Sequence, residues 1–505
     1  MHSIFYDGPH APCPQPFNMA AHVLSQSGVC PDKIALQILH SDHCEDWTYR
    51  ELKSAVLGIA AGLLETGAKT GDLILMRLGN TVDYPLTYLG TLAAGLVPVP
   101  TSTALKLPEV NRIIEELSPT LIISDPAVIS PETGNQIQVH QLQAMRNLPP
   151  VDYQMGDPER LGYVVYTSGT SGKPRAVAHA HRAIWARQMM FEGWYGLLPT
   201  DRILHAGAFN WTYTMGTGLM DPWTAGATAL IPAAGTASAA FPKLLAENDA
   251  TIFAAAPGVY RQILRDRQTL TLPNLRHGLS AGEKLPSATR TAWNNATGTP
   301  IFEAYGMSEC STFLSGSPTK PAHGDRLGHP QTGRRIAILG LDGPVPLGSE
   351  GTIAVHKNDC GLMKGYLNAP HEMADKMQGD WFLTGDQGIM HDDGQISYLG
   401  RNDDMMNAGG YRVSPLEVEQ AFNSYPGMDA VAVTQVEVKA DTHVIVAFYT
   451  GPIALDEVKI NEHVSGLLAR YKQPRLYIRV EALPLGANGK ILRKVLRERY
   501  TQENN

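Results

Sequence analysis

A run of hydroxyl, glycine and cationic residues follows a short apolar segment in the first half of the chain. Residues 161–166 (LGYVVY) predict a buried strand, and seven residues without an apolar side chain come next: Thr167, Ser168, Gly169, Thr170, Ser171, Gly172 and Lys173. Glycine lets backbone N–H groups approach oxygens, while hydroxyls and the lysine ammonium add donors. A flexible linker is seldom held between a strand and a helix such as the one predicted over residues 181–190. The run therefore favours a polyphosphate-binding loop.

This loop differs from a Walker A loop. That pattern requires a glycine where Thr167 stands and a hydroxyl residue where Pro174 stands. Any phosphate binding must therefore follow a different design.

Further polar motifs follow the loop along the chain. Glu309 ends one of them, and a carboxylate is the hard oxygen ligand that suits Mg²⁺. Thr-Gly-Asp at 384–386 indicates only a turn when taken by itself. The motifs in chain order are Ser280-Ala281-Gly282-Glu283-Lys284-Leu285, Ala304-Tyr305-Gly306-Met307-Ser308-Glu309, Thr384-Gly385-Asp386, Gly400-Arg401-Asn402-Asp403-Asp404, Gly410-Tyr411-Arg412 and Gly489-Lys490.

Taken together, these motifs resemble the acyl-adenylate-forming superfamily of acyl-CoA and aryl-CoA synthetases, peptide-synthetase adenylation domains and luciferases. The superfamily signature, Y-T-S-G-[ST]-[ST]-G-x-P-K, matches the loop, and the other motifs follow in the same order between residues 160 and 495. The first 150 residues add only a weak likeness, such as GLVPVP. The resemblance implies a ligase that activates a small carboxylic acid with ATP to acyl-AMP, releases pyrophosphate, and transfers the acyl group to coenzyme A.

The resemblance also implies a role for each matching residue. Lys490, Thr170 and Glu309 would be catalytic, and Glu309 would hold Mg²⁺ against the ATP phosphates. Asp386 would bind the ribose hydroxyls, with Arg401 beside it, and Tyr305 would stack on the adenine unless it is an ordinary core tyrosine. The implied ATP- and AMP-binding residues are Thr167, Ser168, Gly169, Thr170, Ser171, Gly172, Lys173, Gly282, Glu283, Lys284, Ala304, Tyr305, Gly306, Met307, Ser308, Asp386, Arg401 and Arg412.

The sequence departs from the family pattern at two places. Arg175 and Ala176 stand where lysine and glycine are usual, and arginine binds phosphate with a different geometry from lysine. Near the C-terminus, Leu485 and Gly486 replace a basic residue and a hydroxyl residue. Lys490 is retained, but the phosphate contacts of its loop are thereby put in doubt.

Six positions, which we call the acyl site, match those that bind the acid in relatives. They are Trp211, Tyr213, Thr217, Ser280, Ala281 and Gly306. Aromatic side chains shorten such a site, so we expect an aromatic, cyclic or short-chain acid, not a long fatty acid. The alternative is that Trp211 and Tyr213 are ordinary core residues.

Two half-reactions place a conflicting demand on Lys490. A lysine that neutralises charge during adenylation would occupy the place that the incoming thiol must approach. The resemblance therefore implies a C-terminal lid that rotates about a hinge at Asp403 and exchanges Lys490 for a pantetheine path at Gly409 and Gly410.

The pattern of apolar runs predicts the elements that must position these residues. Short β-branched or apolar runs at 71–76, 161–166, 227–231, 251–254 and 300–304 alternate with helical stretches, which indicates α/β layers. Closely spaced strands and turns between about 334 and 400 predict a β-rich module. We expect a large N-terminal domain of layered α/β subdomains over residues 1–400, and a small mobile α+β lid over residues 401–505.

Composition excludes several other classes of protein. A net charge of −8 gives no reason to expect a nucleic-acid partner, and five dispersed cysteines indicate neither a disulfide framework nor a zinc site. The N-terminus lacks the pattern of a secretory signal, so a cytoplasmic location is expected. The uncharged stretches 84–105 and 222–242 contain too many prolines or small residues to predict a membrane span. The oligomeric state is left open.

Three alternative functions remain. An adenylation enzyme that loads a carrier protein would differ only in the molecule that carries the acceptor thiol. A luciferase-like oxidase would need an oxygenation site that the sequence does not indicate. A non-catalytic nucleotide sensor is disfavoured because Glu309, Asp386 and Lys490 occur together.

Overall fold

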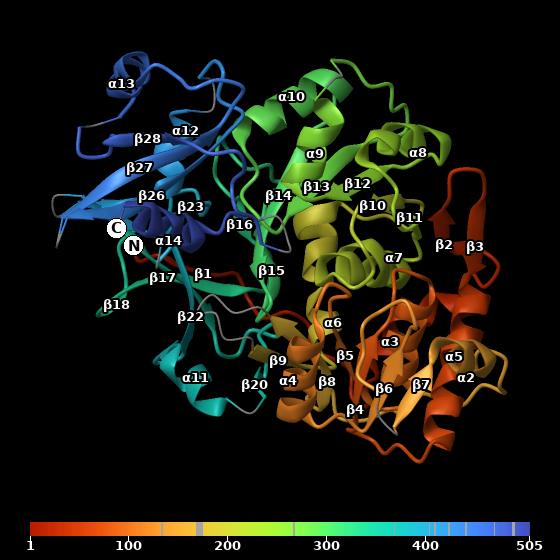
Figure 1. The fold of residues 1–505 in the computed structure, drawn as a ribbon. Coiled ribbons are helices and arrows are strands. Elements are labelled where there is room, and N and C mark those ends of the chain that lie inside the picture. Colours follow the sequence, from red (N-terminus) through yellow and green to blue (C-terminus); the bar gives the residue numbers. More distant parts are fainter. Residues whose placement is uncertain are drawn as a thin grey trace.

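The computed structural model describes residues 1–505 except 133–134, 168–174, 266–267, 368, 403, 409–410, 423–424, 440–441, 469, 487–489 and 505. The side chains at 167, 407, 408, 411, 412, 439, 442 and 504 also lie outside the description. In Figure 1 the blue C-terminal elements form a smaller lobe beside the larger body that the rest of the chain builds.

The largest sheet runs through the middle of the body in the order β16-β15-β14-β13-β12-β10-β11-β2-β3. Neighbouring strands from β14 to β2 are parallel. The strand bounds are β2 Ile34–Leu39, β3 Cys44–Thr48, β10 Arg202–His205, β11 Thr228–Pro232, β12 Ile252–Ala255, β13 His277–Ala281, β14 Ile301–Met307, β15 Ser311–Ser315 and β16 His329–Pro330. Apolar runs predicted strands at 227–231, 251–254 and 300–304, and β11, β12 and β14 confirm them.

Helices cover both faces of this sheet (Figure 1). On one face, α8 Phe241–Glu247, α9 Pro257–Leu264 and α10 Ser287–Thr297 pack a core around Phe253, Tyr260 and Trp293. On the other face, Met190, Trp194 and Tyr195 pack against alternate residues of the same strands. Because strand side chains alternate in direction, β10, β12 and β14 each contribute to both cores. Short helical segments supply the second face: α6 Ala183–Ala186, η2 Phe191–Tyr195, η3 Thr214–Met220 and α7 Asp221–Ala225. The short η4 Ser238–Ala240 packs with α8 and α9 on the first face.

A second α/β layer contains the N-terminal residues. Its parallel sheet has the order β5-β4-β6-β7. Strand β5 contacts β8, which pairs with β9 in a small antiparallel sheet. The bounds are β4 Leu73–Arg77, β5 Val97–Pro100, β6 Leu121–Ser124, β7 Gln136–Gln138, β8 Leu161–Thr167, β9 Arg175–Ala180 and β20 Gly365–Tyr366, with helices α1 Met19–Val23, η1 Ser25–Gly28, α2 Tyr49–Glu65, α3 Asp83–Ala93, α4 Leu107–Leu117 and α5 Val139–Met145. Strands predicted at 71–76 and 161–166 are confirmed.

The segment after the glycine-rich loop differs from the prediction. The loop is followed by strand β9, which pairs antiparallel with β8, and not directly by a helix. The helix expected over 181–190 is broken into α6, a turn at residues 187–188, and the π-helix η2. The break places Arg187 at the end of α6, where its side chain is directed into the protein.

The β-rich module predicted between 334 and 400 is confirmed. Its sheet has the order β1-β17-β19-β22-β21, with β18 and β23 paired to β17 and β22. The N-terminal strand β1 Ile4–Tyr6 joins it antiparallel to β17, which no local pattern predicted. The other bounds are β17 Arg335–Gly340, β18 Gly343–Pro344, β19 Glu350–His356, α11 Pro370–Asp375, β21 Met377–Gln378, β22 Trp381–Met390 and β23 Ile396–Arg401.

The C-terminal part has its own sheet and core. Strand β26 pairs antiparallel with β27, which pairs parallel with β28, and Val433, Ile445 and Ile460 lie in the core beneath them. The bounds are β24 Met406–Ala408, β25 Tyr411–Val413, α12 Pro415–Gln420, β26 Ala430–Lys439, β27 Thr442–Thr450, α13 Glu457–Ser465, β28 Leu476–Arg479 and α14 Arg493–Asn504. Helix α13 begins after its N-cap Asp456 and ends at Ser465.

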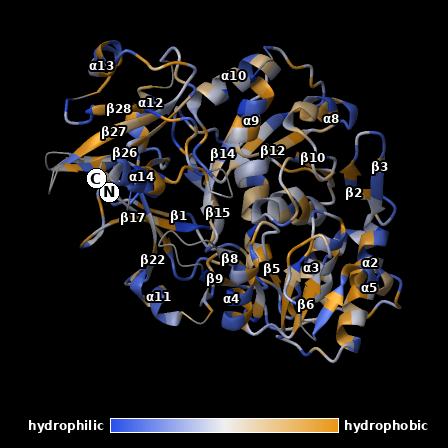
Figure 2. Ribbon diagram, viewed as in Figure 1, coloured by the Kyte–Doolittle hydropathy of each residue, from blue (hydrophilic) through white to orange (hydrophobic). Residues whose placement is uncertain are grey.

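Hydrophobic residues concentrate on the strands of every layer, while the outer faces of the helices are largely hydrophilic (Figure 2). Trp194, Trp223 and Trp293 are among the largest fully buried side chains. Within the described part of the chain, no helix combines the length and apolar character that crossing a bilayer requires.

Candidate active site

Asp386 is buried at the junction of the large sheet and the β-rich module. It lies on β22 directly opposite Arg401 of β23, and the guanidinium is 3.3 Å from its carboxylate. The hydroxyl of Tyr305, at the end of β14, donates to Oδ2, and that of Tyr398 donates to Oδ1 at 3.3 Å. Burial raises the pKa of Asp386, while Arg401 and the Tyr305 hydroxyl oppose the rise. Arg401 and Tyr305, both predicted to bind the nucleotide, therefore contact Asp386, which is also predicted to bind it.

The Tyr305 ring has protein neighbours of its own. It packs edge-on against Phe313 and at a tilt against Tyr398. Its side chain is thus fixed both by ring contacts and by the bond to Asp386. Its stacking on adenine stays a prediction.

Glu309 follows β14 in the turn to β15. Its Oε1 accepts a hydrogen bond from the Tyr366 hydroxyl at 2.7 Å and lies 3.8 Å from the Lys376 ammonium. The side chain is 13% exposed, and within the described residues Oε2 accepts no hydrogen bond. One carboxylate oxygen is therefore held by the protein and the other is available to a ligand.

Helix α11 brings charges to the same region. Glu372, on this helix, forms a bidentate ion pair with Arg175, the first residue of β9 after the glycine-rich loop. Lys376 follows the helix and donates to the Tyr366 hydroxyl at 2.8 Å. The residue that departs from the family pattern, Arg175, thus has a specific partner in this chain.

The loop after β13 is anchored by a buried carboxylate. Glu303 of β14 accepts from the Lys284 ammonium at 2.9 Å, from Arg290 at 2.8 Å and from the Leu285 backbone N–H at 2.8 Å. Lys284, predicted to bind nucleotide, therefore directs its charge to Glu303. Burial raises the pKa of neighbouring Glu283, and Arg261 and Lys490 oppose that rise.

Lys490 lies close to two of the predicted nucleotide residues. Its charge lowers the pKa of both Glu283 and Asp386 against the effect of burial. The lysine belongs to the C-terminal part, whereas the two carboxyl groups belong to the body. The charge of Lys490 therefore acts on both carboxyl groups.

Several predicted residues cannot be placed. Ser168, Gly169, Thr170, Ser171, Gly172, Lys173, Asp403, Gly409 and Gly410 lie outside the described residues, as do the side chains of Thr167 and Arg412. The flanking backbone is described: β8 ends at Thr167 and β9 begins at Arg175 in antiparallel register. The roles of these residues stay predictions.

The aromatic residues of the acyl site form one cluster. Trp211 and Tyr213 meet edge to face with ring centroids 5.1 Å apart, and both contact His205. Gly282 has a φ of +98°, and a Cβ there would lie 3.3 Å from the Trp211 ring. Trp211 therefore packs directly against the loop after β13, as its assignment to the acyl site requires.

Ser280 and Ala281 point to opposite faces of β13. Ala281 belongs to the core of Trp194 and Tyr195, with Tyr213 packed against it. Ser280 has the same parity as Gly278, where a Cβ would meet the Tyr260 hydroxyl on α9. We therefore expect Ala281 to contact the acyl group, whereas Ser280 faces α9 on the opposite side of β13.

Thr217 and Gly306 lie next to residues that the sequence did not single out. Thr217 shares a hydrogen bond of 2.9 Å with Tyr195 and receives one from Arg187. A Cβ on Gly306 would overlap the backbone of Ser311. The sequence analysis did not single out five residues of this region, because each acts through partners that are distant in the chain. These residues are Glu303, Tyr366, Lys376, Arg187 and Asp221.

Two family models match the chain. The model described as AMP-binding enzyme matches residues 25–367, and the one described as AMP-binding enzyme C-terminal domain matches residues 417–490. The first match covers more than half of the chain. This chain belongs to the AMP-binding enzyme family. The family that the sequence motifs indicated is thereby confirmed.

The relatives are acyl-CoA and aryl-CoA ligases. The mitochondrial acyl-coenzyme A synthetase ACSM3 of Pongo abelii is 28% identical, over 96% of this chain and 90% of its own. The 3-hydroxybenzoate–CoA ligase of Aromatoleum sp. (strain CIB) is 27% identical, over 89% and 91%. A crystal structure of a benzoate CoA ligase from Burkholderia xenovorans LB400 has a TM-score of 0.84 and 25% identity, over 95% and 100%. These likenesses confirm the predicted α/β architecture and the predicted ligase class.

Proposed function

We propose that this protein is an AMP-forming ligase that joins a small aromatic, cyclic or short-chain carboxylic acid to coenzyme A. The observation that carries the proposal is the meeting of Tyr305 and Arg401 on the buried Asp386 carboxylate, on which the Lys490 charge also acts. A cation from the C-terminal part and carboxylates from the body are the groups that a nucleotide reaction between two domains requires.

In the first half-reaction the substrate carboxylate attacks the α-phosphorus of ATP. A bond forms between a carboxylate oxygen and phosphorus, and the bond from phosphorus to the bridging oxygen of pyrophosphate breaks. Neither group needs to lose a proton at neutral pH, so catalysis consists of positioning and charge neutralisation. Lys490 supplies a positive charge near the reacting groups, and Asp386 orients the ribose.

The described residues fit a magnesium ion bound with the substrate phosphates. Among them no group of three or more His, Cys, Asp or Glu could hold a metal by itself. Mg²⁺ is commonly bound by one or two carboxylates together with phosphates and water, so a single Glu309 oxygen suffices. Bound Mg²⁺ would neutralise phosphate charge. Tyr366 would hold the Glu309 carboxylate in place through its hydrogen bond.

In the second half-reaction a thiol attacks the carbonyl carbon of the mixed anhydride, and AMP leaves. Lys490 would obstruct this approach if the lid kept one position, which supports a rotation near Asp403 that presents Gly409 and Gly410. Coenzyme A is the proposed acyl acceptor because the named relatives are CoA ligases. A carrier protein is the alternative acceptor.

Two observations support an aromatic acid. Trp211 and Tyr213 occupy the acyl site as bulky, mutually packed rings, which limits its length. The Aromatoleum relative is named for 3-hydroxybenzoate and the Burkholderia structure for benzoate. Flat substrates suit a site lined by aromatic faces.

The proposal is tested by measuring pyrophosphate release with acetate, octanoate, palmitate, benzoates and hydroxycinnamates. We expect a benzoate or cinnamate to give the highest kcat/KM. Adding coenzyme A should then produce AMP and a thioester in equal amounts. Strong preference for palmitate would contradict the substrate class, and adenylate formation without CoA-dependent AMP release would indicate a carrier protein.

A further inference from the structure

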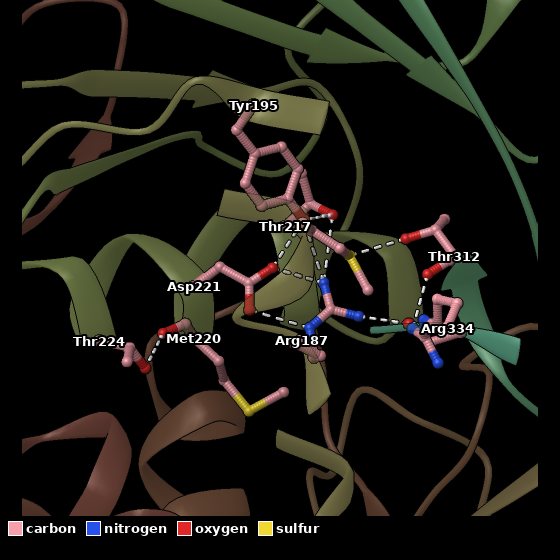
Figure 3. A network of polar contacts seen from close by, with 10 residues as sticks. Arg187, Tyr195, Thr217, Met220, Asp221, Thr224, Thr312 and Arg334 are labelled. Atoms are coloured by element: carbon pink, nitrogen blue, oxygen red, sulfur yellow. Dashed lines mark hydrogen bonds and ion pairs between the residues drawn. The ribbon is translucent and has the colours of Figure 1, made fainter. Parts of the chain in front are cut away.

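An ion pair lies buried beside the acyl site. Arg187 donates to Asp221 through Nε at 2.9 Å and through Nη2 at 2.6 Å, and the Tyr195 hydroxyl donates to the same carboxylate at 2.6 Å (Figure 3). Arg187 is 9% exposed, and Asp221 and Tyr195 are fully buried. The second arm, Nη1, donates to Ser311, while Nη2 also reaches Thr217 at 3.4 Å. We call these five residues the Arg187 network.

The Arg187 network touches the acyl site at two points. Thr217 belongs to both, and a Cβ on Gly216 would lie 2.4 Å from Nη2, so glycine allows the guanidinium to rest against the π-helix η3. Ser311 is the other point, because its backbone lies directly behind Gly306. Ser311 also has a φ of +58°, which is uncommon for a residue with a side chain. π-helical turns and such backbone positions both cluster at functional sites.

Stability alone does not explain this network. Apolar residues of similar volume are often as stabilising as a buried ion pair, because the desolvation of two charges offsets their attraction. The surrounding core contains Met190, Trp194 and Ala304, which would accommodate apolar side chains. Burial lowers the pKa of Arg187, but Asp221 and Tyr195 together raise it by more, so the guanidinium stays charged.

The charges and hydrogen-bond donors of the Arg187 network define which substituent of the acid would fit beside it. Asp221 already neutralises Arg187, so a second carboxylate on the substrate would be a buried, uncompensated charge. The hydroxyls of Thr217 and Ser311 already have protein partners, so a plain hydrocarbon would fail to satisfy Arg187 itself. Within the described residues Nη1 donates to Ser311 alone, so its second N–H can be given to a ligand oxygen. A neutral oxygen satisfies these groups without adding charge.

We infer that the Arg187 network is the distal end of the acyl site and selects an acid that carries an uncharged oxygen substituent, such as a hydroxyl, ether or keto group. Arg187, Thr217 and Ser311 are the specificity-determining residues, and Asp221 and Tyr195 hold the guanidinium in position. The inference rests on the proposed ligase function and refines its substrate class. Sites built to bond an oxygen reject the analogue that lacks it, since their buried polar groups are then unpaired.

The test compares matched acids in the purified full-length enzyme. Hydroxy-, methyl- and carboxy-substituted benzoates, at each ring position, differ in the terminal group but little in size. We expect one hydroxybenzoate to exceed its methyl counterpart by about tenfold or more in kcat/KM, with the benzenedicarboxylate poorest. The ratio of hydroxy to methyl substrate is the measured quantity.

Three variants locate the source of the ratio. Thr217→Val removes one hydroxyl at constant shape and should lower the ratio several-fold, by about the worth of one hydrogen bond. Arg187→Met combined with Asp221→Leu removes both charges together and should bring the ratio to one or below. Thr224→Val is the matched control, because its hydroxyl bonds the Met220 carbonyl outside the network, and its ratio should equal that of the wild type.

The outcomes are distinct. The inference is overturned if the wild type favours the methyl acids, or if Thr217→Val keeps the wild-type ratio. Should the double variant fail to fold, the wild type and Thr217→Val still decide. Failure of every acid to release pyrophosphate would instead overturn the proposed function, whereas activation of all three acid types at equal rates overturns only this inference.

Discussion

The two ends of the active site are built in opposite ways. At the nucleotide end, Glu309, Asp386 and Lys490 come from separate elements, and Glu309 and Lys490 keep access to solvent. At the acyl end, Arg187 and Asp221 are both buried, Arg187 directly after α6 and Asp221 at the start of α7. A charge that must exchange partners during a reaction cycle cannot be locked in place, whereas a charge that only recognises a substituent can be. Under the proposed mechanism, the comparison separates groups that would move with the lid from groups that are preorganised.

The largest effect is expected at the mobile end, from Lys490→Ala. Loss of one charge-stabilising donor should lower acyl-adenylate formation by on the order of a hundredfold. Thioester formation from supplied acyl-adenylate should change little, because the lysine serves only the first step. The two half-reactions are measured separately, by pyrophosphate exchange and by release of AMP.

The matched control is Lys494→Ala, since Lys494 lies four residues later on α14 and is 69% exposed beside Glu498. Its kinetics should equal those of the wild type. Equal impairment of both half-reactions in Lys490→Ala would show that the lid does not alternate between two positions.

A smaller effect is expected from Glu309→Gln. The amide keeps the shape that Tyr366 bonds but loses the negative charge, so the Mg²⁺ concentration for half-maximal rate should rise on the order of tenfold. Titrations of the initial rate with Mg²⁺ measure this shift. Glu247→Gln, on the exposed side of α8, provides the control, and an unchanged Mg²⁺ curve for Glu309→Gln would remove Glu309 from the metal site.

At the acyl end, Trp211→Ala should change which acid is preferred and leave adenylation of small acids possible. Removing the indole opens space against Gly282, so the profile should move toward longer acids by roughly tenfold in relative kcat/KM. The acid panel and a melting curve are recorded together. A lower melting temperature with the original acid profile would show that Trp211 is only a core residue.

The smallest effect on turnover is expected from His205→Gln, which probes how firmly the acyl end is packed. Burial lowers the pKa of His205 to about 3, and its Nδ1 accepts the Gly207 N–H at 2.9 Å. A neutral buried histidine contributes stability above its unfolded pKa near 6.5, which is lost as the pH falls toward 3. Between pH 6 and 4, the free energy of unfolding should fall less steeply with decreasing pH in the variant than in the wild type. The difference should be up to about 1.4 kcal/mol per pH unit.

Chemical denaturation at several pH values measures that slope. His443→Gln changes an exposed histidine on β27 and serves as the control. Parallel slopes for the wild type and His205→Gln would show that His205 does not resist protonation in the folded protein.

Local sequence was sufficient for several central strands of the body and for the family motifs. Runs such as LGYVVY and PIFEA are apolar and β-branched enough to predict β8 and β14 directly. It failed over residues 181–190, because the helix is interrupted where Arg187 turns toward Asp221, a partner 34 residues away. Tertiary pairing prevailed over helical propensity at that point.

The candidate site was predictable only where a residue belongs to a motif. Asp386 and Tyr305 were singled out separately, but their bond across 81 residues follows from the meeting of two sheets. Glu303 received no role, although it fixes Lys284 and Arg290 from a neighbouring strand. Contacts of this kind depend on topology, which no local pattern contains.

The ion pairs around α11 have a consequence for competing anions. Glu372 is an internal counter-ion for Arg175, and Lys376 is one for Glu309. A small oxyanion such as inorganic phosphate or sulfate must displace Glu372 and gains few contacts in return, whereas a triphosphate gains many from the same displacement. Such shielding favours ATP over the simple anions that are abundant in cells. Inorganic phosphate should therefore inhibit the wild type weakly, and it should inhibit Glu372→Gln more strongly.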